Sequence, residues 1–262
     1  MSKFLVTGTS SGLGRFLAEE LNATPFRRNQ ITGIGQHLQQ YYDAIIHCAA
    51  DTRNTIPQVD LWPYYQSNIE LTRQLIRIPH NLFVYISSPA VYPDTFLESK
   101  EMDIPNFPET NPPIHHTYYL YGLFKMLAEQ VVSNNTEKSL IIRCGSIIGR
   151  TTRLTTNTMK VLRNDPSPLT LSAHSSFNLV SMDQIKGFIE LALTKNITGT
   201  FNAGSTKNAT LEEIAKAVGS QPTFGNFIHN VHRMDTSKIR AVSLDFNKSS
   251  LEIAQEIVKE IN

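Results

Sequence analysis

Thr7-Gly-Thr-Ser-Ser-Gly-Leu-Gly14 is a glycine-rich stretch that directly follows a short apolar run, Lys3–Val6. The run predicts a first buried strand, and the apolar residues after Gly14 recur at helical spacing: Phe16, Leu17, Ala18 and Leu21. A strand, a glycine turn and a helix are the context in which free backbone N–H groups and the helix dipole bind a dinucleotide pyrophosphate. An ordinary strand-to-helix turn can show the same pattern. A P-loop is excluded, because no Gly-Lys-Ser/Thr opens the helix.

The glycines of this stretch have different expected tasks. Gly8 would allow a tight turn, Gly12 a close approach of the phosphates, and Gly14 close packing of the helix on the strand. The predicted cofactor-binding residues of the loop are therefore Gly8, Thr9, Ser10, Ser11, Gly12, Leu13 and Gly14.

Tyr121-Gly-Leu-Phe-Lys125 is the stretch most informative about chemistry. Residues four apart share one face of a helix, and a nearby ammonium stabilises a phenolate, so we predict a Tyr121 pKa below the usual value of about 10. Such a phenol can exchange a proton with an alcohol or carbonyl oxygen. Among 9 tyrosines the spacing can also arise by chance. Ser88 follows the apolar run Leu82–Ile86, at the carboxyl end of a predicted strand, where α/β sheets bind ligands. Its position supports a functional role for the Tyr121–Lys125 pair.

The patterns of strands and helices alternate along the chain, which predicts an α/β fold with a Rossmann-like, doubly wound parallel sheet. Continuous apolar runs typical of buried strands lie at Ile45–Ile46, Leu82–Ile86 and Leu140–Ile142, and helical patterns at Tyr64–Ile76 and Tyr119–Val132. We expect a dinucleotide-binding domain over residues 1–150 and a mainly substrate-binding region over residues 151–262. A helix over residues 182–194 should return to the first domain.

The segment after the first helix bears on the choice of cofactor. NAD sites usually place an acid near the end of the second strand, but no Asp or Glu stands between Asn22 and Tyr42. Arg27 and Arg28 instead offer guanidiniums, which suit a 2′-phosphate. NADP is therefore preferred over NAD, although the pair can also be a solvated basic turn. Gln30 and Ile31 would then lie by the adenine.

Composition narrows the classes of partner. A net charge of +1 gives no field toward nucleic acid or an anionic membrane, and aromatic residues do not interleave with basic clusters. Neither a signal peptide nor a membrane span is expected. Cys48 and Cys144 are predicted to be reduced thiols of a cytoplasmic protein. No metal site is predicted, because neither these cysteines nor His115-His116 have partner ligands at metal spacing.

Over nearly its whole length the chain resembles the extended short-chain dehydrogenases/reductases. Tyr42–Ala50, ending in His-Cys-Ala-Ala, looks like the family's fourth strand, which ends beside the cofactor. The resemblance also covers Ser88 in Ser-Pro-Ala-Val-Tyr, Tyr121 with Lys125 and Glu129, and the strand and loop over residues 140–149. It implies the catalytic residues Ser88, Tyr121, Lys125 and Asn68, the last of which would hold the surroundings of the lysine. It also implies further cofactor contacts from Cys48, Ala49, Ala50, Tyr121, Lys125 and Cys144, with Lys125 as an anchor of the nicotinamide ribose.

Some positions depart from the family pattern. Ser11 stands at a usual glycine, Phe124 at a small residue, and Cys144 at a common proline. Ser176 lies near where many nucleotide-sugar members carry an arginine for the diphosphate, so the substrate class stays open. Four arginines could contact a substrate phosphate or form structural salt bridges instead: Arg143, Arg150, Arg153 and Arg233.

The sequence thus predicts an NAD(P)-dependent oxidoreductase that reduces a keto group of a nucleotide-linked sugar. An epimerase with bound NAD is one alternative, and a non-catalytic NAD(P)-binding sensor or scaffold is another. A dehydratase is disfavoured, because that subgroup needs Asp-Glu where this chain has Pro89-Ala90. Relatives commonly dimerise through the helices that carry Asn68 and Tyr121, which leaves a homodimer as an open expectation.

Overall fold

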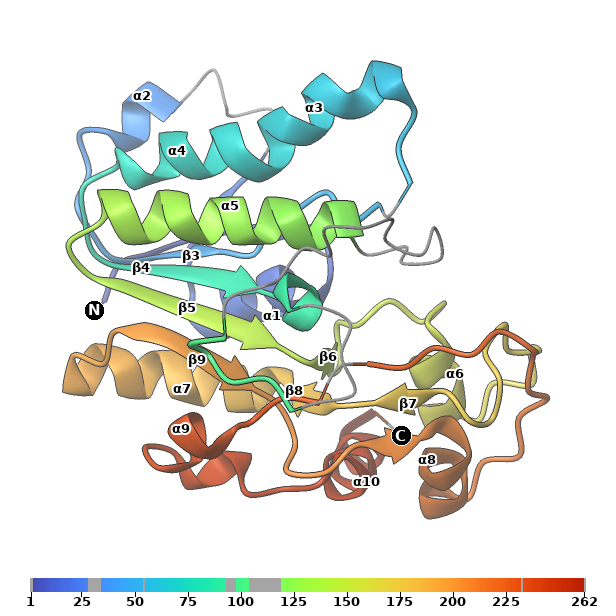
Figure 1. Cartoon of the computed structure of the whole chain (residues 1–262). Coiled ribbons are helices and arrows are strands. Elements are labelled where there is room, and N and C mark those ends of the chain that lie inside the picture. The colour runs from blue at the N-terminus through green and yellow to red at the C-terminus, as the bar shows by residue number, and fades with distance from the viewer. Residues whose placement is uncertain are drawn as a thin grey trace.

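The computed structural model describes residues 2–27, 34–53, 55–92, 98–103, 119–231 and 233–261. Its centre is a six-stranded parallel sheet with helices on both faces (Figure 1). In spatial order the strands are β2 (Thr24–Phe26), β1 (Phe4–Thr7), β3 (Tyr42–His47), β4 (His80–Ser87), β5 (Ser139–Cys144) and β9 (Gly199–Ala203). The Rossmann-like prediction is confirmed.

The strand order locates the ligand-binding edge of the sheet. β2 and β3 lie on opposite sides of β1, so the chain changes direction between β1 and β3, where α/β sheets bind ligands. Thr7 pairs with His47, and Ser87 pairs with Arg143, which aligns the carboxyl ends of the central strands. Among the described residues β3 is the third strand in chain order, whereas the resemblance implied a fourth.

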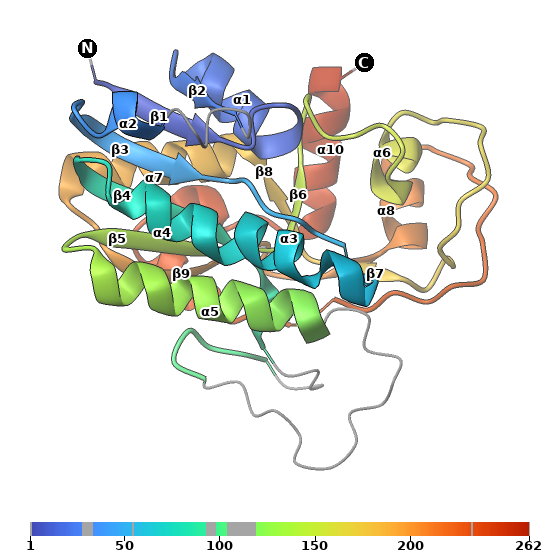
Figure 2. The ribbon, with the colours of Figure 1, turned by 90° about the horizontal axis from the view of Figure 1, so that it is seen from above.

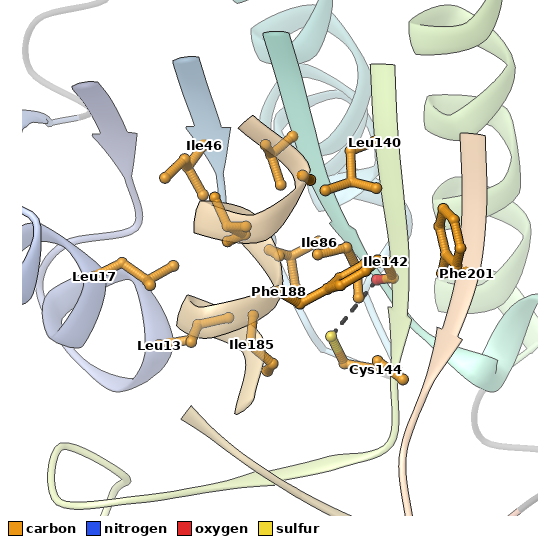
Figure 3. Packing of buried hydrophobic residues seen from close by; sticks show 14 of the residues in the cluster. Leu13, Leu17, Ile46, Ile86, Leu140, Ile142, Cys144, Ile185, Phe188 and Phe201 are labelled. Carbon is orange, nitrogen blue, oxygen red and sulfur yellow. Dashed lines mark hydrogen bonds between the residues drawn. The ribbon is translucent and has the colours of Figure 1, made fainter. Parts of the chain in front are cut away.

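One face of the sheet is covered by α1 (Gly12–Glu20) and α7 (Met182–Lys195). Leu13 and Leu17 of α1 and Phe188 of α7 are buried in one cluster with the sheet residue Ile142 (Figure 3). The Cys144 thiol lies in the same cluster and donates a hydrogen bond to the Ile142 carbonyl at 3.6 Å. Ile185, Phe188 and Ile189 of α7 pack in this same cluster.

The other face is covered by α4 (Leu71–Ile76) and α5 (Tyr119–Asn135), which lie side by side with α3 (Leu61–Tyr65) in Figure 2. Their core includes Tyr64, Leu75, Phe124 and Val132. The predicted helix over Tyr64–Ile76 contains a π-helical turn, η3 (Gln66–Glu70), between α3 and α4. Such turns are rare and often lie at functional sites. Two short helices precede this run, α2 (Ile34–His37) and η2 (Gln58–Asp60).

The rest of the chain builds a smaller part beside the sheet, which Figure 1 shows around α6, α8 and α10. These helices share a separate core that includes Met159, Ile214 and Ile257. Its elements are β6 (Ser146–Ile148), α6 (Asn157–Leu162), β7 (Ser176–Phe177), β8 (Leu179–Ser181), β10 (Ala209–Thr210), α8 (Leu211–Val218) and α10 (Ser250–Ile261). By contrast, α9 (Ser237–Arg240) and η5 (Leu244–Phe246) send Ile239 and Phe246 into the core of the main sheet.

Candidate active site

The glycine stretch forms the turn between β1 and α1, and its geometry accounts for its glycines. Gly8 has a φ of +74°, and a Cβ there would lie 2.9 Å from the Ala49 nitrogen. A Cβ on Gly14 would lie 2.5 Å from the Gly8 carbonyl oxygen, so this glycine allows α1 to pack closely on the turn. Gly12 has a φ of +60° and faces open space. The N-cap residue Ser11 makes no side-chain capping bond to the first turn.

A second loop is bonded to this turn, which the sequence did not predict. The Gly12 N–H donates to the Thr151 carbonyl at 3.0 Å, and the Thr151 hydroxyl donates back to the Gly12 carbonyl at 2.9 Å. The Gly12 N–H is therefore bonded within the protein and is not among the free N–H groups of the loop. Thr151 thereby anchors the loop after β6 over the start of α1.

Thr7 and His47 hold the opposite wall of the turn. The Thr7 hydroxyl oxygen accepts from the N–H groups of Cys48 and Ala49 at 3.1 and 3.0 Å, so its proton is directed to His47 Nδ1 at 2.8 Å. His47 Nε2 then donates to the Thr72 hydroxyl at 3.0 Å. Burial lowers the pKa of His47 to about 3, so the ring is neutral at pH 7. The histidine therefore serves the local structure.

The turn, the segment after β3 and the end of β2 enclose a cavity of about 640 Å³. This volume lies within the range of small-molecule sites. Among the described residues its lining is Thr7, Gly8, Thr9, Ser10, Ser11, Phe26, Arg27, Cys48, Ala49, Ala50, Leu71 and Arg153. The predicted cofactor residue Arg27 thus lies at this cavity, directly after β2. Arg28, Gln30 and Ile31, like His115-His116, lie outside the described residues.

A second cavity, of about 300 Å³, adjoins the first and shares with it Gly8, Ser11, Cys48 and Ala50. It brings together Ser88, Tyr121 and Lys125, which are far apart in the sequence. Its other lining residues are Leu13, Gly14, Thr52, Ile86, Ser87, Cys144, Gly145 and Ile147. One continuous cleft therefore joins the glycine turn to the tyrosine and the lysine.

Lys125 is buried on α5, and its Nζ donates to the Ile86 carbonyl at 2.7 Å. The same Nζ lies 5.8 Å from the centre of the Tyr121 ring and 4.6 Å from that of the Tyr85 ring. Burial lowers the pKa of Lys125 to about 8, so the amine is mostly protonated at pH 7.

Tyr121 departs from the expectation of a lowered pKa. Burial raises its pKa above 10, and a hydrogen bond with Ser88 opposes this only in part. Desolvation is the largest cause, and the hydrogen bond described for Lys125 Nζ goes to the Ile86 carbonyl instead of to the phenol oxygen. Tyr121 therefore carries its proton at neutral pH, which is the form that can donate one.

Ser88 is placed by a short helix, η4 (Pro89–Val91), for which it is the N-cap. Its side-chain oxygen accepts from the Ala90 N–H at 3.2 Å. η4 packs so closely on α5 that a Cβ on Gly122 would lie 1.9 Å from the Ala90 carbonyl oxygen. A side chain at position 122 would push Ser88 away from Tyr121, so Gly122 sets the distance between two of the predicted catalytic residues.

Asn68 lies in the π-helical turn and is buried. Its Oδ1 accepts from the Asp51 N–H at 3.1 Å, and its Nδ2 donates to the Tyr64 carbonyl at 3.1 Å. In the described part of the chain it makes no hydrogen bond to Lys125. Its observed task is to hold the segment that follows the cavity-lining residue Ala50.

Behind the cleft lies a buried ion pair between Glu129 of α5 and Arg143 of β5. Arg143 Nη2 and Glu129 Oε2 are 2.6 Å apart, and the Ser87 hydroxyl donates to Glu129 Oε1 at 2.5 Å. Arg143 also donates to the Tyr92 hydroxyl, which in turn donates to Asn202 Oδ1. Of the four arginines that could contact a substrate phosphate, Arg143 is thus structural. The spacing of Tyr121, Lys125 and Glu129, four apart on one helix face, is the signal that could have indicated this pair.

The described residues show neither a metal-binding cluster nor a membrane-spanning helix. They contain no group of three or more His, Cys, Asp or Glu side chains arranged to hold a metal ion. None of their helices combines the length and the apolar character needed to cross a bilayer.

Comparison with known proteins places this geometry in context. A family model of NAD-binding proteins, described as male sterility protein, matches residues 34–177, over half of the chain. The matched segment begins after the glycine turn and contains Asn68, Ser88, Tyr121 and Lys125. No curated protein matches the sequence.

Several solved structures share the fold over the whole chain. UDP-glucuronic acid 4-epimerase from Bacillus cereus, in complex with UDP-glucuronic acid and NAD, is 21% identical with a TM-score of 0.73, covering 99% of this chain and 100% of its own. dTDP-4-dehydrorhamnose reductase from Yersinia enterocolitica is 20% identical with a TM-score of 0.76, and each chain is covered completely. The corresponding reductase from Bacillus anthracis, in complex with NADP, is 19% identical with a TM-score of 0.77, again with 100% of both chains covered. At these identities the likeness shows the fold.

Proposed function

Because the chain belongs to the extended short-chain dehydrogenase/reductase family, we propose that it is an NADP-dependent reductase of a keto group on a nucleotide-linked sugar. One observation carries this proposal. Ser88, Tyr121 and Lys125 line a cavity that is continuous with the cavity of the glycine turn. A proton donor and a place for a dinucleotide thus meet in one cleft.

The cleft suits a nicotinamide dinucleotide at both ends. Gly8, Thr9, Ser10 and Ser11 of the glycine turn line the larger cavity beside the start of α1, where a phosphate can be bound. Cys48 and Ala50 present small side chains to both cavities, and Ala49 presents one to the larger cavity. Arg27 at the end of β2 supports a 2′-phosphate at the far end of the larger cavity. A bound cofactor would supply the hydride.

The protein's own groups supply the proton. Tyr121 holds its proton at neutral pH, so it can donate to a carbonyl oxygen as that oxygen gains negative charge. Ser88, bonded to Tyr121, can donate a hydrogen bond to the same oxygen. Lys125, still mostly charged at pH 7, then stabilises the phenolate that remains.

Two observations favour a reductase over an epimerase. A protonated Tyr121 is ready for the reductive direction, whereas oxidation of a hydroxyl group requires a tyrosine that accepts a proton. Arg27 at the cavity favours NADP. Among the structures of similar fold, an epimerase holds NAD and a reductase holds NADP.

The proposal is tested with a panel of nucleotide-linked keto-sugars and nucleotide sugars, assayed with NADPH and with NADH while nicotinamide absorbance is followed. We expect oxidation of NADPH with at least one keto-sugar. Conversion of a nucleotide sugar without net oxidation would establish the epimerase instead. Tight binding of the cofactor with no turnover across the panel would support the sensor.

The preference for NADP makes a separate prediction. Replacing both Arg27 and Arg28 with Ala should weaken NADP binding by an order of magnitude or more relative to NAD, because a charge-assisted bond contributes roughly 1.5–3 kcal/mol. Titration calorimetry with both cofactors measures the ratio. Arg15→Ala is the matched control, since Arg15 lies on the exposed side of α1 and pairs with Glu19. An equal loss for NADP and NAD would contradict the phosphate role.

We also propose a homodimer formed through α3, α4 and α5. Trp62 and Leu61 on α3 are 64% and 47% exposed, and Leu127 on α5 is 43% exposed. Trp62 stacks on Tyr65, with ring centroids 5.3 Å apart, which presents a rigid apolar surface. Sedimentation equilibrium should give twice the mass of the 29.5 kDa chain. Leu127→Arg should shift this toward the monomer, and a wild type of single-chain mass at all concentrations would refute the dimer.

A further inference from the structure

Arg153 lies at the larger cavity, beside the glycine turn. Its side chain is exposed and lines the 640 Å³ cavity together with Ser10, Ser11 and Arg27. Within the described ranges its guanidinium makes no hydrogen bond and no ion pair. A surface arginine without a function would have the same features. A binding role for Arg153 therefore has to be argued from the position of its backbone and from the charges around it.

The backbone of Arg153 is fixed on both sides. Two residues earlier, Thr151 exchanges two hydrogen bonds with Gly12 of the glycine turn. The Arg153 carbonyl accepts from the Thr156 N–H at 3.3 Å and from its hydroxyl at 3.2 Å, and Thr156 caps α6. The side chain therefore starts from an anchored position beside the start of α1.

The bond between Thr151 and Gly12 has an electrostatic consequence. It occupies one of the N–H groups with which a helix start binds an anion, and it brings a carbonyl oxygen close to that position. A pyrophosphate at this turn thus loses one donor and gains a nearby acceptor. A cation carried by the same loop offsets both effects.

The charged residues that line the larger cavity also favour an anionic ligand. The described lining of the larger cavity contains two arginines and no carboxylate. Arg150, on the same loop, has a structural role, because it forms an ion pair with Glu20 and lies over the Phe16 ring at 4.7 Å. One loop thus provides one arginine for the structure and one for the cavity.

We propose that Arg153 binds the pyrophosphate of the dinucleotide and replaces the donor that Gly12 gives to Thr151. The proposal rests on the proposed function in that it requires a dinucleotide in the larger cavity. It separates the work of two arginines: Arg153 acts on the pyrophosphate, and Arg27 acts on the 2′-phosphate. Arg153 is thereby a cofactor-binding residue shared by NADP and NAD.

The test is titration calorimetry of the wild type, Arg153→Ala and the matched control Arg150→Ala, with NADP, ADP-ribose and adenosine 2′-phosphate as ligands. Arg153→Ala should weaken NADP and ADP-ribose by about tenfold to a hundredfold, since both carry the pyrophosphate. Adenosine 2′-phosphate, which has no 5′-phosphate, should bind within about twofold of its wild-type affinity. Arg150→Ala should leave all three affinities nearly unchanged, and thermal melts check that both variants are folded.

Three outcomes would overturn the proposal in distinguishable ways. Unchanged ADP-ribose affinity in Arg153→Ala, with a wild type that binds normally, removes Arg153 alone and leaves the reductase standing. A loss for NADP but not for ADP-ribose moves Arg153 from the pyrophosphate to the 2′-phosphate. A wild type that binds none of the dinucleotides contradicts the proposed function together with this inference.

Discussion

Replacing Tyr121 with Phe should lower turnover by about a hundredfold to ten-thousandfold while leaving cofactor affinity nearly unchanged. Phenylalanine keeps the ring at the cavity wall but lacks the hydroxyl that gives its proton to the substrate. Burial raises the pKa of Tyr121, so the wild-type phenol is protonated over the whole neutral range. Steady-state rates on an active substrate from the panel, together with calorimetry of the cofactor, measure the two quantities separately.

Tyr119→Phe is the control for this variant. Tyr119 lies one half-turn earlier on the same helix and has no lysine four residues later. Its replacement should change turnover by no more than a few-fold. If Tyr119→Phe abolished the reaction and Tyr121→Phe did not, the proton donor would have been assigned to the wrong tyrosine.

Lys125→Met should reduce turnover on the order of a thousandfold or more, even with saturating cofactor, because the phenolate of Tyr121 then forms without a cation beside it. Burial lowers the pKa of Lys125 to about 8. Wild-type turnover should therefore fall as pH rises through about 8, where the ammonium is lost. A rate that stays constant from pH 7 to pH 10 would argue against a charged Lys125 in the reaction.

A stability measurement separates this effect from misfolding. Because the folded pKa of Lys125 is below its ordinary value of 10.5, the folded protein binds fewer protons than the unfolded chain between about pH 8 and 10.5. Keeping the charge buried opposes folding below pH 8, and this penalty is relieved as pH rises to 10.5. The unfolding free energy of the wild type minus that of Lys125→Met should therefore increase across this range. Denaturant titrations at several pH values measure it.

Local patterns in the sequence were enough to predict the central strands of the main sheet and the helices that cover them. The runs at Ile45–Ile46, Leu82–Ile86 and Leu140–Ile142 all lie within buried parallel strands, because strands covered on both faces need continuous apolar residues. β9 and α6 were not predicted. β9 is only Gly-Thr-Phe-Asn-Ala and joins the sheet through its pairing with β5, which no local pattern reports.

For the site, residue types were predictable and their interactions were not. The motifs indicated Ser88, Tyr121 and Lys125, and the structure gathers them at one cavity. The raised pKa of Tyr121 depends on burial and on where Lys125 directs its proton, which spacing alone does not contain. The hydrogen bonds between Thr151 and Gly12 join residues 139 positions apart, so no local sequence pattern predicts them.

The buried ion pair of Glu129 and Arg143 connects the wall of the cleft to distant segments of the chain. Through Arg143 and Tyr92 it extends to Asn202, whose Nδ2 donates to the carbonyls of Ser99 and Asp235. Segments from the middle of the chain to its last third must meet before any of these buried polar groups is satisfied. The amide protons around this network should then exchange with solvent together, in the most protected class, so that the wall behind Tyr121 and Lys125 opens only when the main sheet itself unfolds.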